Sequence, residues 1–135
     1  MSAFTRSDQF DILKIDEPQR LVYGWISVIE VDGTTVIDQQ GDVIEEPELV
    51  GSAHEFMTNS RAGKLLHRGE EIGAFVESLV FTRDLQVALG IDLKKVGWFG
   101  VMRVASDDVW KGVMDGTYRS FSIGGSARRE EIEIA

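Results

Sequence analysis

The chain has 135 residues, 43% of them hydrophobic and 27% charged, which is typical of one globular domain and excludes a fibrous array or a wholly disordered protein. Asp and Glu number 23 against 14 Lys and Arg, a formal net charge of -9, and this charge disfavours nucleic acid as a partner. Because the chain contains no cysteine, disulfides, a thiol nucleophile and thiolate zinc sites are excluded.

The N-terminus carries no signal-peptide pattern, and no run approaches the roughly 20 apolar residues of a membrane helix. The sequence therefore predicts a soluble intracellular protein that does not enter a membrane. Only two histidines are present, His54 and His67, so chemistry that depends on histidine has few candidates.

The first part of the chain predicts an N-terminal arm followed by a β-hairpin. Residues 1–19 are polar and irregular, and we expect the folded domain to span residues 20–135. Residues 21–31 are rich in β-branched and aromatic side chains and predict a strand, and Asp32-Gly33 predicts a tight turn into residues 34–37. Residues 43–44 could add a short strand.

The middle of the chain predicts one helix and two strands. Acidic residues and Pro47 favour a helix that begins near Glu45 and ends before Gly63, with an apolar stripe at spacings of three and four. Residues 64–67 and 72–82 predict strands, and residues 84–92 predict a loop with room for a short turn of helix.

The last third predicts strands at 96–104, 118–124 and 128–134, with one helix that Ser106 caps and Asp115-Gly116 ends. Six or seven strands and two helices must then share one core. A closed or strongly curved sheet flanked by helices satisfies this requirement, because closure removes exposed edges.

Two features carry candidate chemistry. Period-two alternation places Ser120 and Ser122 on one strand face, and the small residues Gly124 and Gly125 that follow could let a substrate approach backbone N–H groups. His67 lies at the end of a short apolar strand, where a neutral imidazole can take a hydroxyl proton. The ordinary alternatives are turn chemistry for the serines and a surface position for His67.

The sequence gives weaker support to two other functions, metal binding and nucleic-acid binding. Asp38 and Asp42 flank a turn, but two carboxylates do not make a calcium site, so no metal and no cofactor is expected. A small barrel that binds single-stranded nucleic acid through Tyr23, Trp25 and Trp98 would need a basic groove, which the charge balance disfavours.

The order of several short segments resembles the XkdF-type phage serine proteases, relatives of the prohead (capsid maturation) proteases of tailed phages and of herpesvirus assemblins. Together the matching segments cover roughly residues 20 to 126. They are residues 21–25 (LVYGW), 38–42 (DQQGD), 53–57 (AHEFM), 65–67 (LLH), 76–78 (VES) and 121–125 (FSIGG).

The resemblance implies Ser-His catalysis. Ser122, in the Ser-Ile-Gly context of the family, is the implied nucleophile and His67 the implied general base, with backbone N–H groups near Gly124 and Gly125 holding the oxyanion. Assemblins use a second histidine after the serine, but no histidine follows Ser122 here. Related phage enzymes use a carboxylate, for which Glu77 is the first candidate and Glu131 and Glu133 are alternatives. The family pattern continues beyond Ala135, which would leave the usual third group outside this chain.

The resemblance also implies a fold and partners. We expect an α+β fold, a mixed and mostly antiparallel β-barrel of about seven strands with flanking helices. The implied function is cleavage of phage scaffold and major capsid proteins inside the assembling prohead, in the cytoplasm of the bacterial host. The analogy with assemblins allows a homodimer. The alternative is a catalytically inactive, protease-like scaffold or assembly module of the capsid.

Overall fold

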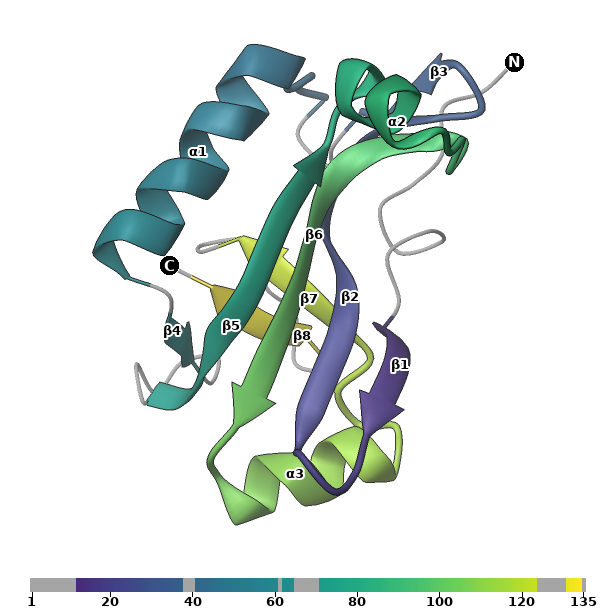
Figure 1. The fold of residues 1–135 in the computed structure, drawn as a ribbon. Helices are drawn as coiled ribbons and strands as arrows, with labels where there is room; N and C mark the ends of the chain where they lie inside the picture. The colour runs from purple at the N-terminus through teal and green to yellow at the C-terminus, as the bar shows by residue number, and fades with distance from the viewer. Residues whose placement is uncertain (1–11, 38–40, 61, 65–70, 124–130, 135) are drawn as a thin grey trace.

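The computed structural model describes residues 12–37, 41–60, 62–64, 71–123 and 131–134. Within them, eight strands form one sheet and three helices pack around it (Figure 1). The predicted α+β class is confirmed. None of these helices is long and apolar enough to cross a membrane.

Three long antiparallel strands form one half of the sheet: β2 (Leu21–Val31), β6 (Lys95–Val104) and β5 (Glu71–Phe81). All three were predicted: β2 from its β-branched and aromatic residues, β5 from alternation and β-branched residues, and β6 as an apolar run with two glycines. Gly97 and Gly100 of β6 lie where a Cβ would meet the Ser27 carbonyl at 2.6 Å and the Ile26 side chain at 2.7 Å. The two glycines therefore allow β6 to pack closely against β2 and its neighbours.

The N-terminal hairpin is confirmed and extended by an additional strand. Asp32 and Gly33 take positive φ angles of 50° and 79°, as a type I′ turn requires, and join β2 to the short β3 (Thr34–Thr35). The prediction that the first strand begins near residue 20 is wrong, because β1 (Ile12–Asp16) pairs with β2. Since Leu13 and Ile15 are exposed, β1 has no burial pattern that the sequence could show.

Residues 43 and 44 do not form the short strand that was expected. Val43 is half exposed and Ile44 packs on the edge of the core. These apolar residues lead into a helix instead of pairing with the sheet.

The three helices are α1 (Glu46–Asn59), α2 (Arg83–Leu89) and α3 (Asp107–Met114). The predicted cap of α3 is confirmed, because the Ser106 hydroxyl accepts a hydrogen bond from Val109 N–H at 3.3 Å. Two helices were expected, and the third, α2, fills the segment for which only a helical turn was allowed. The Thr82 hydroxyl caps α2 by accepting from Leu85 N–H at 3.1 Å.

Three short strands form the other half of the sheet: β4 (Ala62–Lys64), β8 (Glu131–Ile134) and β7 (Ser120–Ile123). The strand order is β1-β2-β6-β5-β4-β8-β7, with β3 beside β2. All pairs are antiparallel except β7 and β8, which are parallel. The expected mixed, mostly antiparallel sheet is confirmed.

The expected closed barrel of about seven strands is wrong, because the sheet is not closed. Closure needs a continuous ladder between the first and last strands. Within the described residues, β1 and β7 lie at opposite ends of the pairing order, and the hydrogen bond from Ile12 N–H to Arg119 C=O, 2.6 Å long, falls just before β7 begins. The sheet curls without becoming a barrel.

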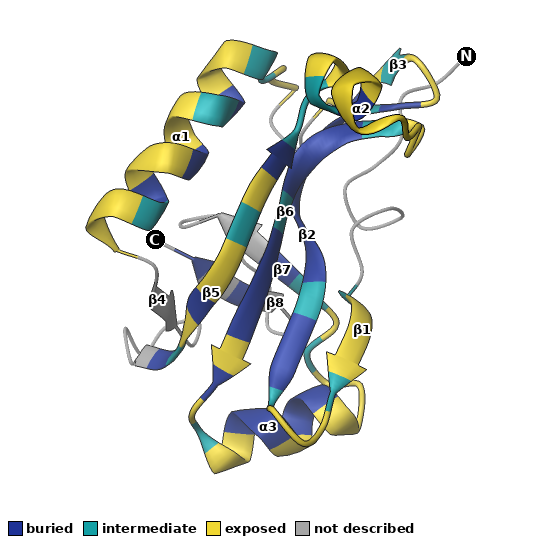
Figure 2. Ribbon diagram, viewed as in Figure 1, coloured by how far each residue is buried: buried dark blue, intermediate teal, exposed yellow. Residues whose placement is uncertain are grey.

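The main core lies inside this curl, and Figure 2 shows the buried residues following β2, β6 and the inner side of α3. Trp98 and Phe75 from the sheet, Phe56 from α1 and Trp110 from α3 belong to it. A second, smaller cluster around Trp25 covers the opposite face of the long strands, with Phe81 and Phe99 packed edge-to-face against Trp25. β2 and β6 are therefore covered on both faces, whereas one face of β5 is largely exposed.

Candidate functional site

The strand that carries Ser122 is held against the core by its neighbour Phe121. Phe121 is fully buried, and its ring centroid lies 5.2 Å from that of Phe75. A Cβ at Gly24 would lie 3.1 Å from the Phe121 ring, so the glycine leaves room for the ring on β2. Phe121 thus joins β7 to both β2 and β5 and fixes where Ser122 lies along the fold.

The turn before β7 is also well bonded. Tyr118 N–H donates to the Gly112 carbonyl at the end of α3, at 3.1 Å. The Asp115 carboxylate accepts from the Thr117 hydroxyl at 2.5 Å and from Thr117 N–H at 2.9 Å. The side-chain bond, followed by the backbone bond, lowers the pKa of Asp115 below its ordinary value.

Strand pairing places the backbone of Ser122 in a row with two residues that are distant in sequence. Ser122 of β7 is opposite Glu133 of β8, and Glu133 is opposite Lys64 of β4. Because neighbouring strands lie about 4.8 Å apart, the Cα atoms of Ser122 and Lys64 are separated by about 10 Å. The row contains Glu133 at its centre, between the serine strand and the strand that leads to His67.

His67 itself lies outside the described residues, and so do Gly124, Gly125 and Asp38. The side chains of Ser122, Glu131 and Glu133 are likewise outside the described part of the structure. The chain to His67 leaves β4 three residues earlier, at Lys64. Three extended residues span at most about 11 Å, which is similar to the distance across the row from Lys64 to Ser122.

Glu77 lies apart from this row. It is exposed on β5 opposite Val101, whereas the residue of β5 that pairs with Lys64 is Glu71. Glu77 lies six positions after Glu71, which is up to about 20 Å along the strand at its usual rise. The pairing therefore places Glu133, the sequence alternative, between β7, which carries Ser122, and β4, which ends three residues before His67, and leaves Glu77 well along β5.

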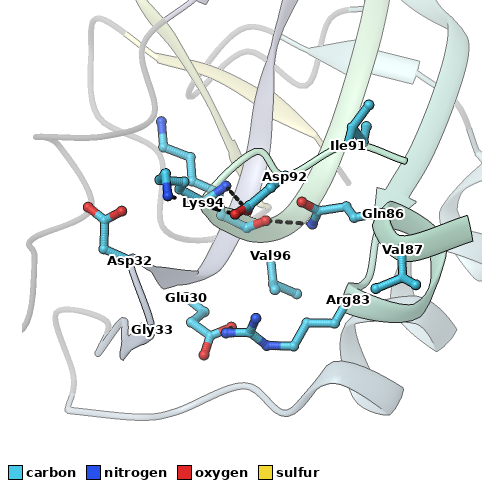
Figure 3. A pocket seen from close by; sticks show the side chains of 11 residues that line it. Glu30, Asp32, Gly33, Arg83, Gln86, Val87, Ile91, Asp92, Lys94 and Val96 are labelled. Carbon is cyan, nitrogen blue, oxygen red and sulfur yellow. Dashed lines mark hydrogen bonds and ion pairs between the residues drawn. The ribbon is translucent and has the colours of Figure 1, made fainter. Parts of the chain in front are cut away.

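A pocket of about 560 Å³ lies beside α2, where β2 ends and β6 begins (Figure 3). Glu30, Arg83, Lys94 and Lys95 are among the residues that line it, and none of the lining residues belongs to the sequence-predicted site. Arg83 Nη2 lies 2.7 Å from Glu30 Oε2, and this hydrogen-bonded pairing raises the pKa of Arg83. The cations and anions of the pocket balance one another.

Gln86 is the polar residue of this region that sequence reasoning missed. Its buried side-chain amide donates to the carbonyls of Phe81 and Lys95, at 3.1 and 2.7 Å, and its Oε1 accepts from Leu93 N–H at 2.8 Å. Glutamine at this position therefore ties α2 to β5 and β6. A polar residue in an amphipathic segment gives no signal of such a role before the fold is known.

Two of the three aromatic residues of the nucleic-acid alternative are packed within the protein, and the third, Tyr23, is half-buried. Trp25 and Trp98 are 4% and 2% exposed, and Trp98 Nε1–H donates to the Ser78 hydroxyl at 2.8 Å. Bases cannot stack on rings that are covered on both sides. Of the three rings, the structure therefore leaves only Tyr23 partly accessible.

Comparison with known proteins gives two curated relatives, both from Bacillus subtilis (strain 168). The chain is 34% identical over 131 residues to "Phage-like element PBSX protein XkdF", covering 96% of this chain and 42% of that protein. It is 32% identical over 123 residues to "Uncharacterized protein YqbD", covering 90% of this chain and 35% of that protein. The chain therefore spans less than half the length of either relative.

No solved structure gives a significant match to the chain. A family described as "Putative phage serine protease XkdF" matches residues 9–131. This match covers the long-strand half of the sheet, all three helices and the serine strand β7. The chain therefore belongs to the family described as "Putative phage serine protease XkdF", as the order of its short segments predicted.

Proposed function

We propose that this chain is a serine endopeptidase domain that cleaves scaffold and major capsid proteins during phage capsid maturation. Family membership supports the reaction class. The observation that carries the residue assignment is the strand row, because it brings β4, which leads to His67, within two strands of Ser122. The setting that follows is the assembling prohead in the cytoplasm of the bacterial host, with a homodimer as the form expected from the assemblin analogy.

The proposed reaction uses Ser122 and His67 in the usual order of acyl transfer. The Ser122 hydroxyl oxygen attacks the scissile carbonyl while His67 takes its proton, and backbone N–H groups near Gly124 and Gly125 bind the oxyanion. Collapse of the tetrahedral intermediate breaks the peptide bond, and His67 returns the proton to the leaving amine. Water, activated by His67, then hydrolyses the acyl-enzyme and regenerates the Ser122 hydroxyl.

The third member of the site is a carboxylate that orients His67. Glu77 was the first candidate from sequence, with Glu131 and Glu133 as alternatives. The row supports Glu133, because it pairs with both Ser122 and Lys64, whereas Glu77 is exposed farther along β5. Our proposal therefore gives Glu133 the role of positioning residue.

The test mixes the full chain with the scaffold and major capsid proteins encoded beside it and identifies new termini by mass spectrometry. Ser122→Ala should lower cleavage by at least about 10³-fold, since loss of a nucleophile leaves only binding and oxyanion stabilisation. Ser120→Ala, two positions earlier on β7, is the matched control and should retain cleavage. Equal cleavage by wild type and Ser122→Ala would reject Ser122, and absence of cleavage by the wild type would favour an inactive assembly module.

The carboxylate assignment is tested by comparing Glu133→Gln with Glu77→Gln. We expect Glu133→Gln to lower kcat by about 10²-fold or more with little change in KM, because a misoriented histidine weakens proton transfer and leaves substrate binding intact. Glu77→Gln should stay within about twofold of wild type. The reverse ranking of the two variants would return the role to Glu77.

A further inference from the structure

β1 is the first strand in the pairing order of the sheet, and within the described ranges it pairs with another strand, β2, on one side alone (Figure 1). Figure 2 shows β1 exposed along most of its length, and the side chains of Leu13 and Ile15 are 59% and 39% exposed. The first residue of the strand is already bonded outside the ladder with β2, because Ile12 N–H donates to the Arg119 carbonyl. We call residues 13–16, on the side away from β2, the β1 edge.

The register shows which backbone groups point out of the β1 edge. Val104 N–H donates to the Arg20 carbonyl at 2.9 Å. In an antiparallel ladder such a bond flanks a non-hydrogen-bonded pair, which here is Leu21 and Arg103. Leu21 therefore directs its own N–H and C=O away from β6 and toward the last residue of β1. Because these directions alternate along a strand, the residue before it, Ile15, points its N–H and C=O away from β2.

The outward groups of Ile15 are open to a partner. No other segment of the described chain makes a hydrogen bond with them. An outward N–H and C=O on one edge residue form the template for an added antiparallel strand, which would exchange both bonds at that position.

The charges of the β1 edge are arranged symmetrically about Ile15. Lys14 and Asp16 lie one position before it and one after it, and period-two alternation puts both side chains on the same sheet face. This is the face of Tyr23, because the Lys14 ammonium lies 4.9 Å from the centre of the Tyr23 ring. A second β1 strand that runs antiparallel, with its Ile15 opposite the first, therefore places each Lys14 opposite the Asp16 of the other copy.

Both charged side chains have the capacity to make this contact. The Asp16 carboxylate accepts from Gln19 N–H at 3.2 Å and from Gln19 Nε2 at 2.9 Å, and an ionised carboxylate has about four acceptor positions. Lys14 is exposed, and its flexible stem can carry the ammonium from the Tyr23 ring to a strand on the other side. The bonds to Gln19 hold the carboxylate in place at the end of the β1 edge.

We propose that the β1 edge binds the β1 edge of a second copy of this chain, in an antiparallel pairing with a two-fold axis at Ile15. Two main-chain hydrogen bonds join the two Ile15 residues, and a Lys14–Asp16 ion pair flanks them on each side. On the opposite face, the two Ile15 side chains cover apolar surface that is exposed in the single chain. The interface rests on the homodimer that the proposed function includes and on no step of the Ser122 reaction.

The symmetry favours a second copy over an unrelated segment. Any strand that fits this edge needs an acid opposite Lys14, a base opposite Asp16 and an apolar residue between them, and β1 itself supplies all three in the required order. An interface in which residue i contacts j and j contacts i is the one that closed two-fold dimers require. Since four residues bury less surface than a permanent interface does, the dimer is expected to be weak.

The first test uses the absence of cysteine from the chain, because a single introduced cysteine then reports the register. The Cα atoms of a hydrogen-bonded antiparallel pair lie about 5.5 Å apart, which a disulfide can bridge. Ile15→Cys should therefore form a covalent dimer under mild oxidation, seen by non-reducing electrophoresis. Leu13→Cys, on the same strand and also exposed, is the matched control. In the proposed register the two copies of residue 13 are offset by about 14 Å, so this variant should cross-link at least about tenfold more slowly.

The second test exchanges charges between copies and measures dimerisation by sedimentation equilibrium, at physiological ionic strength, where long-range repulsion between the acidic chains is screened. Lys14→Asp and Asp16→Lys each place like charges opposite one another on both sides of the axis and should weaken the dimer about tenfold. An equimolar mixture of the two variants restores opposite charges and should dimerise within about threefold of wild type. Glu55→Lys, an exposed acid-to-base change on α1, changes the net charge as Asp16→Lys does and should have less than about a twofold effect.

Circular dichroism of each variant shows whether it is folded. Absence of a wild-type dimer at high concentration, equal cross-linking of Ile15→Cys and Leu13→Cys, or failure of two folded charge variants to dimerise when mixed would each overturn the proposed interface. A dimer that forms with unchanged affinity in both single charge variants would place the contact on another face. None of these outcomes bears on cleavage, which Ser122→Ala tests separately.

Discussion

The two halves of the sheet are built differently. β2, β6 and β5 have 11, 10 and 11 residues, and the two hydrophobic clusters cover both faces of β2 and β6 and one face of β5. β4, β8 and β7 have only three, four and four residues, and they carry or lead to the proposed catalytic residues. A half of long strands with a large core thus supports a half of short strands that holds the candidate site.

This difference teaches which contacts the proposed site depends on. The short strands make few hydrogen bonds, so their position relies on single buried side chains: Phe121 in β7, and Ile132 and Ile134 in β8. Sites of this kind are accurate only when the supporting residues are locked by packing. We therefore expect the two halves to respond differently to substitution.

The largest expected loss of stability comes from removing the two aromatic rings that connect the long-strand and short-strand halves of the sheet. Phe75→Ala and Phe121→Ala each delete a buried ring and should cost about 3–5 kcal/mol in urea unfolding, a large fraction of the stability of a small domain. Phe75 contacts Phe56 and Phe121, so its loss should weaken both halves together. Phe121→Ala should instead speed amide exchange mainly in β7 and β8.

Hydrogen exchange followed by mass spectrometry separates these outcomes. Leu79→Ala, on the exposed face of β5, is the control and should cost less than about 1 kcal/mol. If Phe121→Ala loosens β2 and β6 as much as β7, the two halves form one cooperative unit and the comparison fails.

The sequence predicted the long half well, because composition and periodicity are local signals. The strand at 21–31, the I′ turn at Asp32-Gly33 and the Ser106 cap follow from residue type alone. The short half depends on which strands pair, and period-two alternation says nothing about the partner. The parallel pairing of β7 with β8, and hence the row through Lys64, Glu133 and Ser122, could not be read from the chain.

The open sheet was missed for a related reason. A count of six or seven strands fits a closed barrel, and the resemblance to assemblin-like proteases implied one. A barrel closes only if its first and last strands are long enough and aligned to pair with each other. That alignment depends on the register of every strand pair, which a count of strands does not give. β1 was overlooked because its side chains are exposed, and it occupies the end of the sheet that a barrel would have closed.

A smaller effect is expected at the helix caps that precede each half. Ser106→Ala removes the side-chain acceptor for Val109 N–H, and Thr82→Ala removes the one for Leu85 N–H. Each loss should cost about 1 kcal/mol in chemical denaturation. Only Ser106→Ala should also speed amide exchange in β7, since α3 leads directly into that strand.

Ser106→Asp supplies the control, because aspartate is also a good N-cap and should restore most of the stability. Faster exchange in β7 with Thr82→Ala, and none with Ser106→Ala, would show that α3 does not support the serine strand.

The smallest expected effect lies in the turn between α3 and β7, where the Thr117 hydroxyl lowers the pKa of Asp115. Thr117→Val keeps the side-chain shape and removes the hydroxyl, so the pKa of Asp115 should rise toward its ordinary value, as measured by NMR titration of the carboxyl carbon. A lowered folded-state pKa stabilises the protein above the unfolded-state pKa, and this contribution is lost as the pH falls through the folded-state pKa. The stability difference between wild type and Thr117→Val should therefore be present at neutral pH and vanish in acid.

Asp115→Asn is the control, because asparagine cannot titrate and should abolish this pH dependence. If the pKa of Asp115 is unchanged in Thr117→Val, then Thr117 N–H alone holds the turn that leads into β7.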